Sequence, residues 1–327
     1  MIGIRTPFRM SFIGGGSDLK EFYSRSPGCV ISTTIDKYMY IFTHPFFDER
    51  IQLKYSKTEL VDEIEDIKHP IIREVLKKFN LNGIDINSIS DIPAGTGLGS
   101  SSSFTVALLH ALNSYTNQHV SPELLARDAC EIEIDILKEP IGKQDQYAAA
   151  YGGLNIINFL SDGHVNVEPI IIDSKALEIF QSNLVLFSIG STRKASKILL
   201  DQKQNILSDS NIFSALSEMV DLASIAKNYL VKFDFEEFGR VLDQNWKLKK
   251  SLSKKISGME IDNIYKLGIK NGAFGGKLLG AGGGGFILFY CEKKYQDKLK
   301  SALKKLREVK FKFDDSGSKV IIDHTIK

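Results

Sequence analysis

The sequence predicts a globular protein of two domains in which helices and strands are mixed. The chain has 327 residues, of which 43% are hydrophobic and 25% are charged, and this composition is ordinary for a globular protein. Its length is enough for two separate hydrophobic cores. Strand-like segments come first, whereas beyond about residue 180 the sequence predicts long helices between further strands. We therefore expect one domain in residues 1–180 and a second in residues 181–327.

The N-terminal elements follow from β-branched and aromatic residues. Residues 29–35 and 38–44 are typical of strands, and the short link Asp36–Lys37 between them suggests a hairpin. Residues 51–56 alternate in the same way, and residues 69–79 look helical.

A turn-rich loop and two helices follow. Residues 91–103 form the loop, and residues 104–116 place large apolar side chains on one helical stripe. The next helix is predicted to begin with Ser121 as its N-cap and Pro122 in its first turn, and to run to about Lys138.

The remaining elements alternate between the two types. A hairpin is predicted from two strand-like segments on either side of Ser161, Asp162 and Gly163. Beyond it the sequence predicts strands at residues 183–189, 284–290, 309–313 and 319–323, and helices at residues 211–232, 234–256 and 293–307.

Charge balance and cysteine content narrow the classes of function. The chain has 42 basic and 40 acidic residues, a net charge of +2, which gives no reason to expect a nucleic acid as partner. The 3 cysteines lie far apart without metal-ligand spacing, which fits a reducing cytosol. The N-terminus lacks a signal-peptide pattern, and the longest apolar stretch, Leu278 to Tyr290, is too short to span a membrane. We expect a cytoplasmic protein with no membrane partner.

The main chemical clue is a loop of glycines and serines at residues 95–103, GTGLGSSSS. Glycine lets backbone N–H groups approach an anion closely, and the serines fall where a helix begins, whose free N–H groups and dipole favour phosphate. These residues could instead only cap the helix, but three glycines and four serines are more than a cap needs. We predict a phosphate-binding loop, although the chain contains no Walker sequence, G-x-x-x-x-G-K-[ST].

A second glycine run, GAGGGG at residues 280–285, satisfies the pattern G-x-G-x-x-G. A dinucleotide-binding fingerprint follows a strand and opens a helix. This run is followed by the strand-like FILFY instead, so we reject a Rossmann fold. The run could serve only the close packing of backbone segments.

Two carboxylates are candidates for chemistry. Helical periodicity places Glu133 on a small and apolar face, so that it points inward. A buried carboxylate needs a partner, which is either a metal ion or a buried arginine or lysine. Asp145 follows that helix within GKQDQYAAAYGG, where Gly142 and the alanines allow tight packing. It could accept a hydroxyl proton, or it could be an ordinary turn aspartate.

Three segments in this order resemble the GHMP kinases, the family of galactokinase, homoserine kinase and mevalonate kinase. They are TPFRMSFIGGGSD at residues 6–18, PAGTGLGSSSS at residues 93–103 and GGKLLGAGGGGF at residues 275–286. The resemblance implies a two-domain α+β fold, with an N-terminal mixed sheet under helices and a ferredoxin-like C-terminal domain. It also implies ATP as co-substrate, Mg²⁺ as cofactor and a sugar hydroxyl as acceptor.

The same resemblance implies roles for individual residues. Asp145 acts as the base or orienter, and Arg9 steadies the phosphoryl group during transfer. Glu133 and Ser101, or a neighbouring serine, hold Mg²⁺. The ATP phosphates are bound by Gly95, Gly97, Leu98, Gly99, Ser100, Ser101 and Ser102, the sugar is bound by Gly15, Gly16, Ser17 and Asp18, and the site is closed by Gly282, Gly283 and Gly284.

The resemblance also bears on the substrate. Galactokinases carry a Glu-His pair where this chain has Gly15 and Gly16, which speaks against galactose. The segments FIGGGSDL and GKQDQYAAAYGGLN are more similar to the bacterial heptose 7-phosphate kinases, with the fucokinase-like branch next. This implies phosphorylation of the C1 hydroxyl of D-glycero-D-manno-heptose 7-phosphate to the 1,7-bisphosphate, on the route to GDP-heptose for surface glycans.

A phosphorylated substrate needs cations, and GSTRKASK at residues 190–197 offers Arg193 and Lys194. These residues could instead begin a solvated basic helix. Two other functions remain open: a fucokinase- or galactokinase-like kinase of an unphosphorylated hexose, and a non-catalytic sensor of sugar and ATP. The sequence is compatible with a monomer or a homodimer.

Overall fold

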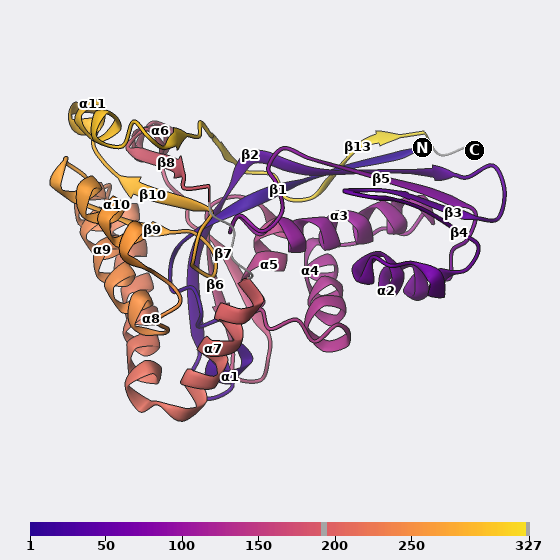
Figure 1. Ribbon diagram of the computed structural model, residues 1–327, viewed down its shortest axis with the longest axis horizontal. Helices are drawn as coiled ribbons and strands as arrows, with labels where there is room; N and C mark the ends of the chain where they lie inside the picture. Colours follow the sequence, from indigo (N-terminus) through magenta and orange to yellow (C-terminus); the bar gives the residue numbers. More distant parts are fainter. Residues whose placement is uncertain (191–194, 325–327) are drawn as a thin grey trace.

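The computed structural model describes residues 1–190 and 195–324, which form two β-sheets with helices packed against them (Figure 1). The large sheet has nine strands within these residues, and the small sheet has four. The predicted α+β fold with a mixed N-terminal sheet is confirmed, because β3 (Ile51–Lys54) pairs in parallel with β5 (Ile84–Ser90). The path of the large sheet continues through β13 (Lys319–Asp323), β1 (Ile2–Ile13), β2 (Gly28–Pro45), β5, β3 and β4 (Thr58–Val61), while β12 (Phe313–Asp314) and β6 (Asn155–Phe159) pair with β2 and β7 (Val165–Pro169) pairs with β6.

One long strand replaces the hairpin that the sequence predicts around Asp36 and Lys37. β2 runs without reversal through 18 residues and pairs with β1 along most of that length. Its register on β1 shifts between Pro7 and Phe8, because Asp36 and Lys37 are extra residues in a β-bulge. The amide of Asp36 donates to the carbonyl of Lys312 instead, at 2.8 Å. The hairpin prediction was wrong because a polar pair can mark a bulge as well as a turn.

Helices beside the large sheet place the glycine-serine loop. α3 (Ser100–Tyr115) packs against β1 and β2, and the loop leads directly into its first turn. Ser121 caps α4 (Pro122–Cys130) as predicted, because its hydroxyl accepts from the amide of Leu124 at 3.2 Å. α4 continues into a π-helical segment, η2 (Glu131–Ile136). The other helices of this part are α1 (Lys20–Tyr23), α2 (Pro70–Phe79), α5 (Gln144–Tyr151) and α6 (Ser174–Ser182), with a 3₁₀ turn, η1 (Ile64–Asp66).

The small sheet has the ferredoxin-like succession β-α-β-β-α-β, as predicted. β8 (Leu184–Ser188) is followed by a group of helices and then β9 (Gly275–Leu278), and the glycine run leads from β9 into β10 (Phe286–Tyr290). α11 (Lys293–Ala302) then leads to β11 (Arg307–Glu308), so the strand predicted at 309–313 is replaced by two very short ones. The helices of the group are α7 (Ala195–Ser208), α8 (Ser210–Val231), α9 (Phe235–Ser251) and α10 (Met259–Lys270). No helix in the described part of the chain is long and apolar enough to cross a membrane.

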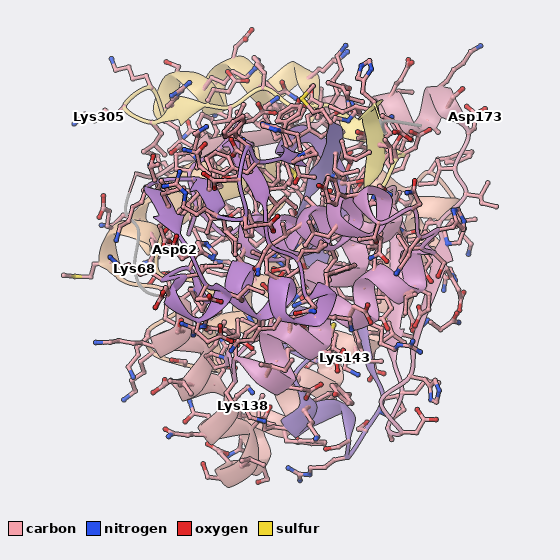
Figure 2. All side chains as sticks on the ribbon, turned by 90° about the vertical axis from the view of Figure 1, so that its right-hand side faces the viewer. Asp62, Lys68, Lys138, Lys143, Asp173 and Lys305 are labelled. Atoms are coloured by element: carbon pink, nitrogen blue, oxygen red, sulfur yellow. The ribbon has the colours of Figure 1, made fainter. Side chains whose placement is uncertain are left out.

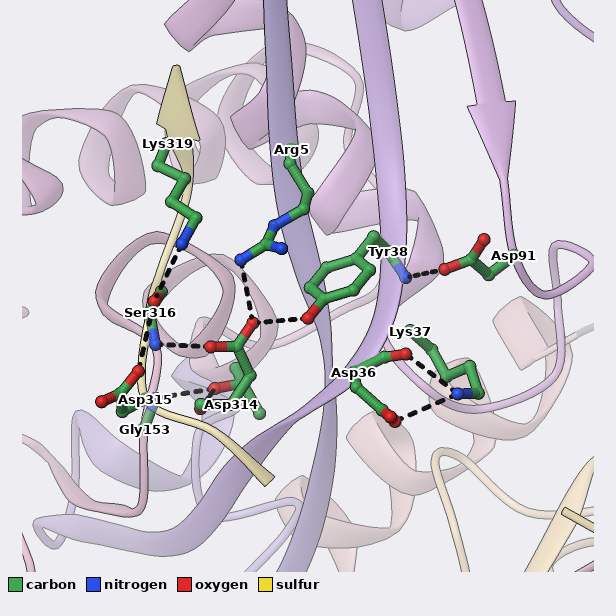
Figure 3. A network of polar contacts seen from close by, with 11 residues as sticks. Arg5, Asp36, Lys37, Tyr38, Asp91, Gly153, Asp314, Asp315, Ser316 and Lys319 are labelled. Atoms are coloured by element: carbon green, nitrogen blue, oxygen red, sulfur yellow. Dashed lines mark hydrogen bonds and ion pairs between the residues drawn. The ribbon is translucent and has the colours of Figure 1, made fainter. Parts of the chain in front are cut away.

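The C-terminal segment returns to the large sheet (Figure 1). The carboxylate of Asp314 accepts from the Tyr38 hydroxyl at 2.8 Å and from the Arg5 guanidinium at 3.4 Å (Figure 3). The strand pairing of residues 313–323 therefore places them with the first predicted domain. The division near residue 180 itself stays a prediction.

An aromatic cluster joins the two parts of the molecule. The Phe12 ring of β1 meets Phe180 and Phe238 edge-on, with ring centroids 5.8 and 5.7 Å apart. Phe180 and Phe238 lie 4.9 Å apart in the same manner, and all three side chains are fully buried. This shared core packs β1, α6 and α9 against one another.

Candidate active site

Two neighbouring cavities share part of their lining, and the outer one adjoins the glycine-serine loop. The outer cavity has a volume of about 440 Å³ and is lined by this loop, by Glu133 and by the glycine run after β9. The inner cavity, of about 70 Å³, is lined by the loop after β1 and by side chains from α9 and β9. Arg9 and Asp145 line both cavities, so they stand at the junction.

The glycine-serine loop has the backbone of a phosphate cradle. Gly95, Gly97 and Gly99 all have positive φ angles, of 77°, 86° and 76°. Gly99 is the N-cap of α3 and supplies no side chain, so the first amides of the helix remain open to an anion. Ser103 does not cap the helix either, because its hydroxyl donates to the Pro7 carbonyl at 2.9 Å. The geometry therefore favours phosphate binding over simple capping.

The second glycine run supports this loop by close backbone contact. A Cβ added to Gly97 would lie 2.4 Å from the Leu279 carbonyl oxygen, and one added to Gly280 would lie 2.5 Å from the Gly97 Cα. A Cβ on Gly285 would lie 2.2 Å from the Thr96 carbonyl oxygen. These distances are too short for any side chain, so the two glycine segments interlock.

A buried ion pair joins β1 to the first turn of α5. Arg9 donates from Nε and Nη2 to the two carboxylate oxygens of Asp145, at 2.8 and 2.7 Å. Its Nη1 donates to the Gly97 carbonyl at 2.7 Å, which links the pair to the phosphate cradle. Arg9 is almost fully buried, while Asp145 remains partly exposed towards the cavities. The pair brings together residues that are 136 positions apart in the sequence.

Glu133 points inward from η2, as helical periodicity predicts. It is 1% exposed, and it accepts from Ser101 Oγ at 3.2 Å and from Gln146 Nε2 at 2.6 Å. Burial raises the pKa of Glu133 to about 7, against the opposing effect of hydrogen bonds such as that from Ser102. No arginine or lysine pairs with it among the residues described, so the alternative of a buried ion pair is not supported.

These donors fit Mg²⁺ that arrives with a nucleotide. One buried carboxylate and one hydroxyl line the outer cavity beside the phosphate cradle. Magnesium is usually held by one or two carboxylates together with substrate phosphates and water. Residues 1–190 and 195–324 contain no group of three or more His, Cys, Asp or Glu that could hold a metal ion.

Asp18 is the main acceptor of the inner cavity. Its carboxylate accepts from the Gly16 amide at 2.9 Å, the Gln144 amide at 3.3 Å and the Gln144 side chain at 3.1 Å. Burial raises its pKa above the ordinary value. Gly142 is required beside it, because a Cβ there would lie 2.0 Å from Asp18 Oδ2. Ionised, a carboxylate with three donors keeps a further site for a sugar hydroxyl.

Some predicted site residues contribute through the backbone. Gly15 and Gly16 line the inner cavity, but Ser17 does not, because its hydroxyl is bonded to Gly14 and Cys29 behind the loop. Leu98 is fully buried and accepts from the Arg9 amide at 3.0 Å. The amide of Gly283 donates to the Ile256 carbonyl at 2.9 Å, while its neighbours Gly282 and Gly284 line the outer cavity.

Arg193 and Lys194 lie outside the described residues. The neighbouring Ala195 and Ser196 line the outer cavity. The role of the two basic residues stays a prediction.

Two lysines of the inner cavity were missed from the sequence. Lys249 comes from α9 and Lys277 from β9, and both are at least nine-tenths buried. Lys277 could have been recognised as unusual in the sequence, because it interrupts the apolar start of the segment GGKLLGAGGGGF. Lys249 stands in a lysine-rich helix that resembles a solvated surface, so nothing in the sequence separates it from its neighbours.

A third cavity, of about 570 Å³, adjoins the other side of the phosphate cradle. It shares His69, Ile71, Ser100 and Ser101 with the outer cavity. Its wall carries apolar and aromatic side chains, including that of Phe104. Such a wall suits a planar base.

Both parts of the chain match known families. The profile of the GHMP kinases N terminal domain matches residues 66–153, and that of the GHMP kinases C terminal domain matches residues 226–309. The first match contains the phosphate cradle, Glu133 and Asp145.

Individual relatives are similar over most of this chain. The D-glycero-alpha-D-manno-heptose 7-phosphate kinase of Campylobacter jejuni is 32% identical over 93% of this chain and 93% of its own. The L-fucokinase/L-fucose-1-P guanylyltransferase of Bacteroides fragilis is 26% identical over 86% of this chain but only 34% of its own. A crystal structure described as a D-glycero-D-manno-heptose 1-phosphate kinase from Bacteroides thetaiotaomicron aligns with a TM-score of 0.82 and 25% identity, covering 99% of this chain and 100% of that one.

Proposed function

The chain belongs to the GHMP kinase family, and we propose that it transfers the γ-phosphate of ATP to the C1 hydroxyl of D-glycero-D-manno-heptose 7-phosphate. The observation that carries the proposal is the position of Arg9 and Asp145 where the outer cavity, which contains the phosphate cradle, meets the inner cavity that contains Asp18. The heptose 7-phosphate kinase of Campylobacter jejuni, similar over almost the whole chain, supports the choice of sugar.

ATP lies across two cavities in this proposal. Its base occupies the apolar cavity beside Phe104, and its phosphates follow the amides from Gly95 to Ser102. The γ-phosphate then points towards Arg9, whose guanidinium faces both cavities. Arg9 and the cradle amides meet the negative charge that develops on the transferred group.

Glu133 and Ser101 would hold Mg²⁺ beside the phosphate cradle. When bound, the ion neutralises charge on the phosphate oxygens and helps to align them. Gln146 keeps the Glu133 carboxylate oriented through its hydrogen bond of 2.6 Å.

Asp145 orients the acceptor and takes its proton. The two hydrogen bonds from Arg9 hold the carboxylate at the junction, where an Oδ atom can receive the proton of the C1 hydroxyl. An anomeric hydroxyl is more acidic than an ordinary alcohol, so positioning counts for more than base strength. Asp18 accepts a hydrogen bond from another hydroxyl of the sugar and sets the orientation of the ring.

The cellular setting is part of the same proposal. The product, a 1,7-bisphosphate, would feed the synthesis of GDP-heptose for surface glycans. A cytoplasmic location fits the need for ATP and the three cysteines, which are all buried and free. The active protein is a monomer or a homodimer.

A kinase of an unphosphorylated hexose is the second candidate, and the similarity to a bifunctional fucokinase favours it. A non-catalytic sensor is disfavoured by the site, because the ion pair, the inward carboxylate and the phosphate cradle are all in place.

Screening the purified protein for ADP release with a panel of sugars and sugar phosphates tests the proposal. We expect turnover with the heptose 7-phosphate, and ³¹P NMR should show the new phosphate on C1. Turnover with neutral L-fucose or galactose alone would favour the second candidate. ATP binding without ADP release from any acceptor would favour the sensor.

A further inference from the structure

Two buried lysines face the inner cavity and have no role in the phosphoryl transfer described above. Lys249 is 5% exposed and Lys277 is 4% exposed. Lysines such as Lys68, Lys138 and Lys305 instead extend into solvent on the outside of the molecule (Figure 2). An ammonium group is costly to bury unless an anion or several acceptors surround it, so the two positions need an explanation.

The acceptors that the protein offers to these lysines are few. Lys249 Nζ donates to the Gly15 carbonyl at 2.9 Å and to Gln202 Oε1 at 3.1 Å, and both of these acceptors are neutral. Lys277 Nζ has no hydrogen bond and no ion pair within the described residues. Among residues 1–190 and 195–324, its amine therefore faces the inner cavity without a hydrogen-bonding partner.

The charges around the inner cavity do not cancel when its groups are ionised. Arg9 and Asp145 neutralise each other through their two hydrogen bonds. Asp18 is then the remaining carboxylate of the cavity, against the two ammonium groups of Lys249 and Lys277. Burial lowers the pKa of Lys249 to about 8 and that of Lys277 well below its ordinary value, an effect to which the neighbouring cations Lys249 and Arg9 contribute. With all of these groups ionised, the described residues of the inner cavity carry one positive charge that no carboxylate balances.

The position of the lysines separates them from the nucleotide. Both line the inner cavity and neither lines the outer cavity with the phosphate cradle. Gly16 leaves the ammonium of Lys249 uncovered, because a Cβ at this residue would lie only 3.2 Å from Lys249 Nζ. A sugar that occupies the inner cavity with its C1 hydroxyl at Asp145 therefore has both lysines in the wall of its pocket.

We propose that Lys249 and Lys277 bind the phosphate group at the far end of the sugar substrate and select a sugar phosphate over the neutral sugar. The inference rests on the proposed function, because it takes the reacting hydroxyl to lie at Asp145. A phosphate carries up to two negative charges and several acceptor oxygens, so it supplies what both ammonium groups lack. The two cations approach it from different elements, α9 and β9.

Steady-state kinetics with Lys249→Met and Lys277→Met test this assignment. Each variant is assayed with D-glycero-D-manno-heptose 7-phosphate and with the same heptose without phosphate. A charged hydrogen bond contributes about 1.5–3 kcal/mol, so each variant should raise KM for the phosphorylated sugar by roughly 10- to 150-fold. The kcat/KM for the neutral heptose should stay within about threefold of wild type. Lys277→Arg should recover part of the loss.

The matched control is Lys250→Met, since Lys250 follows Lys249 on α9 but pairs with Asp262 at 3.0 Å and does not line the cavity. It should behave as wild type with both sugars. Thermal unfolding checks the fold, and Lys277→Met should be at least as stable as wild type because it removes a buried amine that has no hydrogen-bonding partner among the described residues.

Other results would overturn the assignment. Equal losses with both sugars would assign the lysines to the sugar ring or to the fold. Unchanged KM values in both lysine variants would mean that the phosphate binds elsewhere. In that case Arg193→Ala should raise the KM for the heptose 7-phosphate. Calorimetric binding of the heptose 7-phosphate without ATP separates this inference from the proposed function. If the wild-type protein binds the heptose 7-phosphate and Lys277→Met does not, the phosphate site is supported even without turnover. Turnover on a neutral sugar alone would contradict both the proposed function and the phosphate site.

Discussion

Arg9 and Asp145 show how a residue pair creates a reactive position. Their two hydrogen bonds hold one carboxylate at the meeting point of two cavities. Asp145→Asn keeps the size of the side chain but cannot take a proton from the acceptor. We expect kcat to fall by about two orders of magnitude or more, with the Kd for ATP nearly unchanged. Rapid-quench turnover and nucleotide binding by fluorescence measure the two effects.

Asp135→Asn provides the control for that experiment, because Asp135 lies nearby on η2 but is exposed. It should retain wild-type kcat. Normal turnover by Asp145→Asn would remove Asp145 from the mechanism.

Glu133 makes the stability of the metal-free protein depend on pH. Its pKa is about 7 in the folded protein, against an ordinary value of 4.5. Between these two pH values the folded protein binds a proton that the unfolded chain releases, so the free energy of unfolding falls as pH rises. The total loss from this group is about 3 kcal/mol, at 1.36 kcal/mol per pKa unit.

In the variant Glu133→Gln the side chain is neutral at every pH, so this pH-dependent contribution to the free energy of unfolding is absent. Gln146 Oε1 is buried and has no hydrogen-bonding partner among the described residues, so it can accept from the new amide after a flip of the Gln146 side chain. Urea unfolding at pH 5 and pH 8 without magnesium should show the variant gaining stability relative to wild type at the higher pH. A difference that does not change with pH would contradict the prediction.

At the scale of elements, two glycine segments act as one unit. The loop before α3 and the run between β9 and β10 contact each other through their backbones at Gly97 and Gly280. Gly280→Ala adds a Cβ 2.5 Å from the Gly97 Cα, at a φ of 79° that strains alanine. The cradle should shift and lose amide contacts to phosphate, raising KM for ATP about 10- to 100-fold.

Initial-rate kinetics at varied ATP measure this effect. Gly258→Ala is a suitable control, since a Cβ at that position meets nothing within 4 Å and the backbone there is extended. An unchanged KM for Gly280→Ala would mean that the cradle holds its shape without the second glycine segment.

At the scale of the whole molecule, the last described strands tie the chain back to its beginning. Asp314 accepts from Tyr38 and Arg5, and β13 covers the edge of β1 (Figure 3). Asp314→Ala leaves both donors without this acceptor, so the free energy of unfolding should fall by about 1–3 kcal/mol. Chemical denaturation tests this, with the exposed Asp315→Ala as the control.

Measuring the activity of Asp314→Ala distinguishes a loss of stability from a change in the active site. Because Asp314 lines neither the outer nor the inner cavity, kcat measured well below the melting temperature should remain at the wild-type level. A stability equal to wild type would show that Asp314 is not needed to anchor the tail.

Much of the site was visible in short stretches of sequence. The glycine-serine loop, the N-cap of α4 and the inward face of Glu133 were all predicted, because backbone preference and helical periodicity act over a few residues. The β-bulge at Asp36 and Lys37 was not predicted, because the same polar pair is equally compatible with a turn when the partner strand is not known. Helices α7 and α10 were not identified, although their amphipathic patterns are as clear as those of α8 and α9.

The sequence by itself determined the glycine-serine loop at the start of α3 and which carboxylates were candidates for chemistry. Only the tertiary structure decided that Arg9 grips Asp145, and that Lys249 and Lys277 converge on one cavity. The physical reason is the difference in sequence separation between the interactions involved. A local pattern specifies the conformation of a segment and the face it buries, whereas contacts between distant residues depend on strand order and on how the sheets and helices pack.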